Sequence, residues 1–143
     1  MLKKTMTYVN FNGDQVTEDL YFNLTTAEIV KLEADLGGDV KKFADNLLIS
    51  NNLTDIITFV QTIILNSYGE KSQDGSKFLK NARIREEFEC SMAYAELFEE
   101  LMTDPKKAEA FAAGIGMKVG EQDHKMTLLQ QAREQQAKMK GSE

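Results

Sequence analysis

The chain has 143 residues, 42% of them hydrophobic, which is enough to bury the core of one ordinary domain without disulfides or metal ions. Its formal net charge of −6 predicts an acidic surface that repels phosphates, so a nucleic-acid partner is not expected. No apolar run approaches the roughly 20 residues needed to cross a bilayer, so we expect no membrane partner and an intracellular protein.

The composition changes near Met117. All twelve aromatic residues lie before that point, and residues 118–143 carry five basic and four acidic side chains. We therefore expect one globular domain over residues 1–117 and a polar tail over 118–143. The tail offers only a thin apolar stripe, which is too little to order it alone, so we expect it to be mobile or to depend on a partner. The stripe consists of Met126, Leu128, Leu129, Ala132 and Met139.

The N-terminal segment predicts a β-hairpin over about residues 4–22. Residues 4–10 and 16–22 are rich in β-forming side chains that partly alternate between polar and apolar. Asn12-Gly13 lies between them and tolerates the positive φ angles of a tight turn, so we place the turn at 11–14. Two strands alone are marginal in water, and one face of the hairpin should therefore pack on helices.

Three helices are predicted next, over about residues 26–36, 39–50 and 53–67. Thr25 and Glu28 form a capping box before the first helix, and Gly37-Gly38 ends it. The second helix places one apolar face, which includes Leu47 and Leu48, on the core. The third has one charged residue and is apolar most of the way round, so we expect it to be the most buried helix.

After a loop built on two glycine turns, two further helices are predicted over about residues 82–103 and 105–115. Asn81 is a good cap for the first, and Asp104-Pro105 starts the second. The predicted fold class is therefore α+β: an N-terminal β-hairpin packed on a predominantly helical bundle, with a polar C-terminal tail.

The residue types that most catalytic and metal sites require are scarce. The only histidine, His124, lies in the tail, and the only cysteine, Cys90, falls within a helical apolar pattern that predicts a buried, unreactive thiol. One Cys and one His 34 positions apart do not make a zinc site. Glycine-rich phosphate loops are absent, and the abundant carboxylates are typical of a solvated helix face. We expect no catalytic residues, no cofactor, no metal and no enzyme activity.

The helix predicted over 82–103 carries two apolar stripes. One contains Ile84, Phe88, Ala95, Phe98 and Met102, and the other contains Cys90, Tyr94, Leu97 and Leu101. One interpretation is a helix packed between the hairpin and other helices. The other is that Tyr94, Leu97 and Leu101 bind a partner, because an apolar arc wider than one packing face often marks an interface.

Three stretches together are similar to a known family: the opening Lys4 to Leu24, the middle Ile64 to Gly75, and Ala93 to Leu101 followed by Thr103-Asp104 and Phe111. In order and spacing, over about residues 3–116, they resemble the tail assembly chaperones of siphophages that infect Gram-positive bacteria. The tail from Lys118 onward lies outside this resemblance.

The resemblance implies a non-enzymatic chaperone in the host bacterial cytoplasm. Its partners would be the tape measure protein, which it coats, and tail tube subunits, which it helps to recruit, while a homo-oligomer stays open. Two alternatives share the same composition: a structural tail completion or connector component of the virion, and a small host-side protein-binding adaptor.

Overall fold

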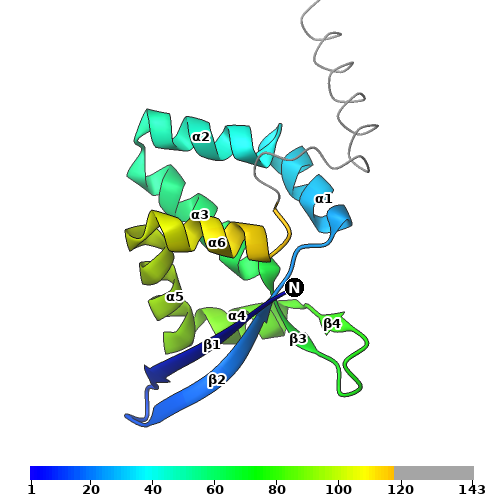
Figure 1. The fold of residues 1–143 in the computed structure, drawn as a ribbon, viewed down its shortest axis with the longest axis vertical. Helices are drawn as coiled ribbons and strands as arrows, with labels where there is room; N and C mark the ends of the chain where they lie inside the picture. The colour runs from blue at the N-terminus through cyan, green and yellow to red at the C-terminus, as the bar shows by residue number, and fades with distance from the viewer. Residues whose placement is uncertain (118–143) are drawn as a thin grey trace, which may run out of the picture.

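The computed structural model describes residues 1–117, and every structural statement below concerns that part of the chain. It contains β1 (Leu2–Val9), β2 (Gln15–Phe22), α1 (Thr26–Leu36), α2 (Val40–Ser50), α3 (Leu53–Ser67), β3 (Tyr68–Lys71), β4 (Phe78–Leu79), α4 (Ala82–Glu89), α5 (Met92–Thr103) and α6 (Pro105–Gly114). Figure 1 shows the strands in the lower half of the molecule and α2 at its top. The predicted α+β fold, with an N-terminal hairpin and a helical bundle, is confirmed.

The hairpin formed by β1 and β2 lies where the sequence predicts it. The strands are antiparallel, in a register that pairs Leu2 with Phe22 and Val9 with Gln15. The connecting turn is stabilised by the side chain of Asn10, whose Oδ1 accepts hydrogen bonds from two turn amides. Gly13 has a φ of 83°. It is the one residue of the turn with a positive φ, so Asn12 does not need the left-handed conformation that the prediction assigned to both.

A second hairpin extends the sheet, although the sequence was interpreted as a loop there. β3 pairs with β2 and with β4, which gives the strand order β1-β2-β3-β4. The turn between β3 and β4 is held by Asp74, whose carboxylate accepts hydrogen bonds from the Ser72 hydroxyl and from the amide and hydroxyl of Ser76. These bonds lower the pKa of Asp74 to about 2.

The first three helices agree closely with the predicted segments. α1 and α3 have the predicted bounds, and the capping box of Thr25 and Glu28 is present. α2 begins at Val40 because Asp39 serves as its N-cap, with a side chain that accepts a hydrogen bond from the Lys42 amide. α6 ends at Gly114, one residue earlier than predicted.

The helix predicted over 82–103 is two helices. α4 ends at Glu89 and α5 begins at Met92, because the Ser91 side chain accepts a hydrogen bond from the Tyr94 amide and so caps a new helix. Cys90 lies at the break and is exposed, which corrects the expectation of a buried thiol. The apolar pattern of the sequence continues through Cys90 and Ser91, but the helix does not.

The core is organised around Phe22, which is fully buried at the end of β2. Its ring makes edge contacts with the rings of Tyr68, Phe88 and Phe111, at centroid distances of 5.6, 5.8 and 5.2 Å. The Leu24 amide then donates a 2.8 Å hydrogen bond to the Ile115 carbonyl. Residues from both ends of the domain and from its middle thus share one core.

α5, rather than α3, is the helix with the most buried side chains. α5 buries Ala93, Tyr94, Leu97 and Leu101, whereas the buried residues of α3 are confined to Ile63, Ile64 and Ser67 near its C-terminus. Figure 1 shows α2 and the start of α3 at the end of the molecule away from the sheet. The segment 53–67 is a helix as predicted, but the expectation that it is the most buried one is wrong.

Candidate partner-binding surface

The structure places all three residues predicted to bind a partner in the core. Leu97 is fully buried, and Tyr94 and Leu101 are each only 8% exposed. Their helix, α5, packs against β1, α3, α4 and α6. A partner could touch these side chains only after α5 separated from its neighbours, so their burial fits the alternative interpretation, and partner binding through them stays a prediction.

Tyr94 carries a buried polar atom. Its ring packs edge-on against Phe88 at a centroid distance of 5.7 Å. No residue of 1–117 makes a hydrogen bond of ordinary geometry with its hydroxyl. Burial raises the pKa of Tyr94, and the nearby Gln61 amide partly opposes that increase. The group is a phenol in a packed interior, and the Glu89 carboxylate adds to the increase in its pKa.

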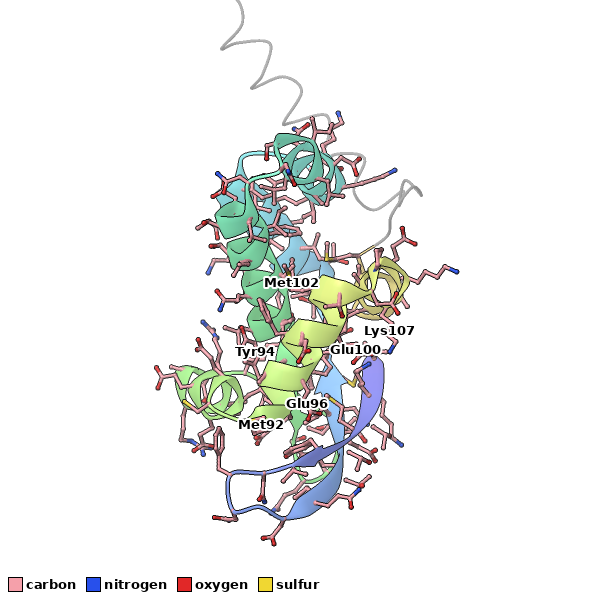
Figure 2. All side chains as sticks on the ribbon, turned by 90° about the vertical axis from the view of Figure 1, so that its left-hand side faces the viewer. Met92, Tyr94, Glu96, Glu100, Met102 and Lys107 are labelled. Atoms are coloured by element: carbon pink, nitrogen blue, oxygen red, sulfur yellow. The ribbon has the colours of Figure 1, made fainter. Side chains whose placement is uncertain are left out.

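The two stripes of the predicted long helix exchange roles in α5. The stripe expected to face a partner is the one that packs on the core. The other stripe, at Ala95, Phe98 and Met102, is partly or fully exposed. Figure 2 shows Tyr94 directed toward α3 and Met102 higher on the same helix. The exchange follows from the break at Ser91. The stripes were assigned by counting 100° per residue along one continuous helix, and that count does not carry over from α4 to α5.

Three large apolar side chains are exposed together where α2 meets α3. Leu48 is 69% exposed, Ile49 is 81% exposed and Leu53 is 63% exposed. We call Leu48, Ile49 and Leu53 the apolar corner. A cluster of exposed large apolar residues is unusual on a soluble domain and often marks a protein interface.

The geometry of the two helices explains why the corner is exposed. α2 faces the core through Val40 and Leu47, which are seven residues apart and therefore on one side of the helix. Leu48 and Ile49 follow Leu47 by about 100° and 200°, so they turn away from that side. Asn51, with a φ of 53°, ends α2 and lets α3 begin two residues later.

The start of α2 is fixed by a buried carboxylate. Glu33 of α1 is 5% exposed, and its Oε2 accepts a 3.0 Å hydrogen bond from the Val40 amide. The rings of Phe43 and Phe59, 5.5 Å apart, join α2 to α3. The apolar corner is therefore presented by a braced pair of helices rather than by a loop.

Charged side chains of both signs lie around the corner. Asp45 and Asp55 are exposed, and within the described part of the chain neither forms an ion pair. Lys41 and Lys42 are also exposed, and they precede Leu48 and Ile49 by seven residues each, so they lie on the same sides of α2. This surface suits an amphipathic segment whose apolar face is bordered by charged side chains.

A second place with exposed apolar side chains is the turn of the first hairpin. Phe11 is 78% exposed and Val9 is 53% exposed. Figure 1 shows this turn and the α2–α3 connection at opposite ends of the molecule. The two places are thus separate surfaces.

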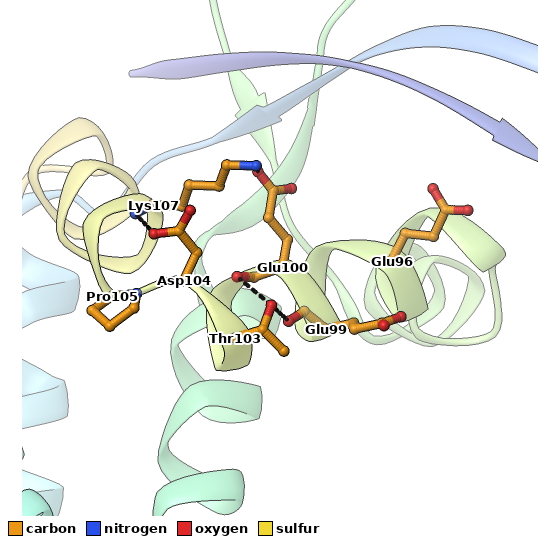
Figure 3. A pocket seen from close by; sticks show the side chains of 7 residues that line it. All are labelled: Glu96, Glu99, Glu100, Thr103, Asp104, Pro105 and Lys107. Atoms are coloured by element: carbon orange, nitrogen blue, oxygen red, sulfur yellow. Dashed lines mark hydrogen bonds and ion pairs between the residues drawn. The ribbon is translucent and has the colours of Figure 1, made fainter.

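A depression lined mainly by carboxylates lies where α5 meets α6, and Figure 3 shows it from close by. Glu100 is its central group, because its Oε1 lies 3.0 Å from the Nζ of Lys4 and 3.4 Å from the Nζ of Lys107. Two lysines therefore already neutralise this carboxylate. The remaining lining includes Glu96, Glu99 and Asp104.

Other kinds of site find no support in residues 1–117. No three His, Cys, Asp or Glu side chains there are grouped so that they could hold a metal ion. No helix in the same range is long and apolar enough to cross a membrane. Cys90 lies far in sequence from His124, which is outside the described residues.

Comparison with known proteins decides the family. A family model described as phage tail assembly chaperone matches residues 1–141. The chain belongs to this family. No curated protein and no solved structure matches it.

The family match is longer than the resemblance noted from the sequence. That resemblance ended near Gly116, whereas the match continues to residue 141 and therefore includes most of the polar tail. The expectation that residues from Lys118 onward lie outside the likeness is therefore wrong as far as residue 141.

The apolar corner was missed in the sequence, although one signal pointed to it. The segment 53–67 is apolar most of the way round, which predicts the most buried helix but fits an exposed apolar surface as well. An overly wide apolar arc indicates an interface on this segment as much as on α5. The prediction that Leu48 lies on the core face of its helix is wrong, because Leu48 is exposed.

Proposed function

We propose that this tail assembly chaperone binds apolar helical segments of the tape measure protein through the apolar corner and helps to recruit tail tube subunits. The observation that carries the proposal is the joint exposure of Leu48, Ile49 and Leu53 on two braced helices. A helix of the client would lie across the corner with its apolar face toward α2 and α3.

The energy available at the corner suits reversible binding. Full burial of one large aliphatic side chain contributes about 1.5–3 kcal/mol, and the three residues are already partly covered. Loss of translational and rotational freedom on association opposes this gain. The half-buried Ile56 and Ile57 of α3 extend the contact, and the chaperone can still be released when the tail is built.

The charge of the domain supports a role in keeping a client dispersed. Residues 1–117 carry a formal net charge of −7, so chaperones bound along one long client would repel one another at short range. Their acidic surfaces would also keep the complex in solution while its apolar segments are covered.

Recruitment of tube subunits requires a surface that stays accessible when the client is bound. The hairpin turn with Phe11 and Val9 lies at the opposite end from the apolar corner. We assign tube recruitment to that end. The protein would then act without catalysis, in the cytoplasm of the infected host, for a siphophage of Gram-positive bacteria as the resemblance implies.

The proposal is tested by co-expression of the chain with fragments of the tape measure protein and measurement of the affinity of the purified pair. Ile49→Ser should weaken binding at least about tenfold, because it removes the most exposed apolar side chain of the corner. Leu79→Ser, at a 43% exposed position on β4, is the matched control and should bind as the unchanged chain does. Equal binding by both variants would overturn the corner as the client site.

Two further measurements separate the alternatives. A chaperone should be absent from purified virions, whereas a completion or connector component should be present in them. A host-side adaptor should bind no tape measure fragment at all.

A further inference from the structure

We propose that the free edge of β1 binds an extended segment of a tail tube subunit, which adds to the four-stranded sheet and places a basic side chain next to Glu96. This inference deepens the recruitment of tube subunits proposed above, and it rests on that proposal for the identity of the partner. The site lies between β1 and the helices α5 and α6, away from the apolar corner.

β1 lies at the edge of the sheet, because within residues 1–117 it pairs only with β2. The Asn10 amide donates a hydrogen bond to the Asp14 carbonyl, one position beyond the last pair of the ladder. Bonded pairs alternate along an antiparallel ladder, so the even-numbered residues of β1 bond to β2. The backbone N–H and C=O groups of Lys3, Thr5 and Thr7 therefore point away from β2.

These outward backbone groups have no partner in the described chain. Neither the amides nor the carbonyls of Lys3, Thr5 and Thr7 bond to a residue of 1–117. The same alternation appears on β2, where the Asn23 amide just after the strand bonds to the Ser67 carbonyl on the side of β3. A row of unpaired groups on a sheet edge is a template for one more strand.

A groove runs along the free edge. Residues 4–7 of β1 form one side of it, and Glu96, Glu100 and Lys107 of α5 and α6 form the other. Figure 2 shows these three side chains on the side of the helices next to β1, and Figure 3 shows Glu96 and Glu100 pointing from α5 toward that strand. A bound strand would therefore have backbone on one side and side chains of the helices on the other.

Side chains of the bound strand would alternate between two surroundings. Met6 is buried and Tyr8 is half-buried, whereas Thr5 and Thr7 are exposed on the other face of β1. Residues opposite Met6 and Tyr8 would therefore face α5, and residues opposite Thr5 and Thr7 would face solvent. The helices thus select every second side chain of the partner.

The side of the groove formed by the helices is acidic. The groove and the adjoining depression are lined by four carboxylates and two lysines, a formal net charge of −2: Glu96, Glu99, Glu100 and Asp104 against Lys4 and Lys107. Both lysines lie within 3.4 Å of the Glu100 carboxylate. Glu96 makes no ion pair with a residue of the described chain, so it lacks a basic neighbour.

The carboxylate of Glu96 lies near the Tyr8 end of the edge. The hydrogen bond that its hydroxyl donates to Glu18 raises the pKa of Tyr8 to about 12, and burial and the Glu96 carboxylate add to the increase. Lys3 and Asp19 form a separate ion pair of 3.5 Å on the outer face of the hairpin. A basic side chain opposite Tyr8 would therefore complement the carboxylates on the α5 side.

The position of the edge supports a tube subunit as the occupant. Its Tyr8 end adjoins Val9 and Phe11, the exposed apolar residues of the turn proposed to recruit tube subunits. A strand bound to β1 and an apolar contact with this turn would form one continuous interface. The apolar corner would stay accessible to the tape measure protein.

The test titrates the full, isotope-enriched chain with the synthetic peptide acetyl-Thr-Lys-Thr-Val-Thr-Val-Thr-amide, whose lysine would lie opposite Tyr8. The NMR signals of the Thr5 and Thr7 amides should shift, and their exchange with solvent should slow at least about tenfold when the peptide is saturating. The signal of Ile49 in the apolar corner should stay unchanged. Unshifted Thr5 and Thr7 signals at millimolar peptide would overturn the proposal.

Two methylated peptides test strand pairing without any change to the protein. A methyl group on the amide of the third residue, which would bond to Thr7, should weaken binding at least about tenfold. The same group on the amide of the fourth residue, which would point away from β1, should weaken it less than about twofold. Equal affinities of the two methylated peptides would overturn pairing with the edge.

Two proline variants test which edge is used. Thr7→Pro and Thr17→Pro both remove the 2.8 Å contact between the two threonine hydroxyls, and neither removes an N–H that bonds between β1 and β2. Thr7→Pro should weaken peptide binding at least about fivefold, and Thr17→Pro should leave it unchanged. Equal effects, or a loss only in Thr17→Pro, would overturn β1 as the site.

A charge reversal tests the role of Glu96. Glu96→Lys should weaken binding of the lysine peptide about threefold or more, and it should strengthen binding of a peptide with glutamate in place of that lysine. Glu109→Lys makes the same change in net charge at an exposed position of α6 outside the groove, and it should have little effect. Equal effects of the two variants would overturn the assigned basic neighbour.

Sedimentation of the full chain without peptide tests for a second copy on the edge. A dimer that Thr7→Pro disrupts and Thr17→Pro preserves would assign the edge to a second copy and overturn the inference. Sedimentation that is the same for both variants supports a free edge.

Purified tube subunits separate this inference from the proposed function. Weaker binding of tube subunits by Thr7→Pro than by Thr17→Pro supports both. If the peptide does not bind but Phe11→Ser weakens binding of tube subunits, this inference fails and the recruitment role stands. If the peptide binds the edge but tube subunits do not bind the unchanged chain, the recruitment role and the identity of the partner fail, while the strand site stands.

Discussion

The Nζ of Lys80 lies 2.7 Å from the Oε2 of Glu28, although 52 positions separate the two residues in the chain. The same ammonium group donates hydrogen bonds to the backbone carbonyls of Asn23 and Asn66. Lys80, in the segment before α4, is therefore bonded to the start of α1, to the residue after β2 and to the end of α3.

Replacement of Lys80 by methionine should destabilise the domain by about 1–3 kcal/mol, because two carbonyls and one carboxylate lose a partly buried donor. Lys77→Met is the control, at an exposed lysine whose side chain makes no ion pair with a described residue, and it should change stability by less than about 0.5 kcal/mol. Urea unfolding measures both. A Lys80→Met chain as stable as the control would contradict the role assigned to Lys80.

The same contact should make stability depend on pH in the acidic range. Burial alone would raise the pKa of Glu28, but hydrogen bonds from Lys80 and the Thr25 amide outweigh it and hold this pKa below its ordinary 4.5. A lowered carboxyl pKa stabilises the fold above the unfolded value, and that contribution is lost as pH falls through the folded value. The difference between unchanged chain and Glu28→Gln should therefore shrink below about pH 4.5, as followed by urea unfolding at several pH values.

Leu97→Asp should abolish the cooperative thermal transition. Leu97 is fully buried, so the substitution places a charge in the core at a cost of several kcal/mol, against a total stability of about 5–15 kcal/mol for a typical domain. Circular dichroism during heating measures it. A normal melt combined with loss of client binding would instead support the partner-binding role predicted for Tyr94, Leu97 and Leu101.

Gly69→Ala should destabilise the second hairpin. A Cβ at this position would lie 2.8 Å from the Phe78 ring and 2.9 Å from the Leu79 carbonyl oxygen, so β4 must move away. Overpacking of this kind typically costs about 1–3 kcal/mol. Gly38→Ala is the matched control, because a Cβ there meets nothing within 4 Å and φ is not positive, and it should be neutral or slightly stabilising. Equal effects of the two substitutions on urea unfolding would contradict this account.

Cys90 should react readily with a disulfide reagent in the folded protein, because it is exposed at the break between α4 and α5. Cys90→Ala should cost little stability, in contrast to the cost expected from the sequence for a buried thiol. If the thiol reacts only after the domain unfolds, Cys90 is covered in solution and this prediction is wrong.

His124→Ala should leave binding of the tape measure protein intact, because we expect no catalytic role for this residue.

The helices and the first hairpin were predictable because their ends are fixed by residues close together in the sequence. The capping box at Thr25 and Glu28, the turn at Gly13 and the cap at Asp104 each satisfy backbone groups within a few positions, so their helices and hairpin were predicted with nearly correct bounds. The second hairpin was missed because β3 gains its ladder from β2, which lies far away in the chain.

The apolar corner could not be located from the spacing of apolar residues alone, because that spacing shows neither where a helix breaks nor which apolar face is covered. Ser91 can continue a helix or cap a new one, and the break that it makes moved the core to the stripe of Tyr94 and Leu97. In the same way, an apolar segment such as that around Leu53 is compatible with burial in a core or with exposure at an interface. The choice is set by how far the other helices extend, and Leu48 and Ile49 show that they end short of this corner.

The hydrogen bond between the Leu24 amide and the Ile115 carbonyl has a consequence for synthesis on the ribosome. Phe22 emerges early, yet its ring contacts Tyr68, Phe88 and Phe111, which follow at wide intervals along the chain. Tyr68 and Phe88 can cover part of the ring earlier, but its contact with Phe111 forms only after α6 has left the exit tunnel. A chain interrupted before Ile115 should therefore leave Phe22 partly uncovered and be cleaved by proteases more readily than the complete chain.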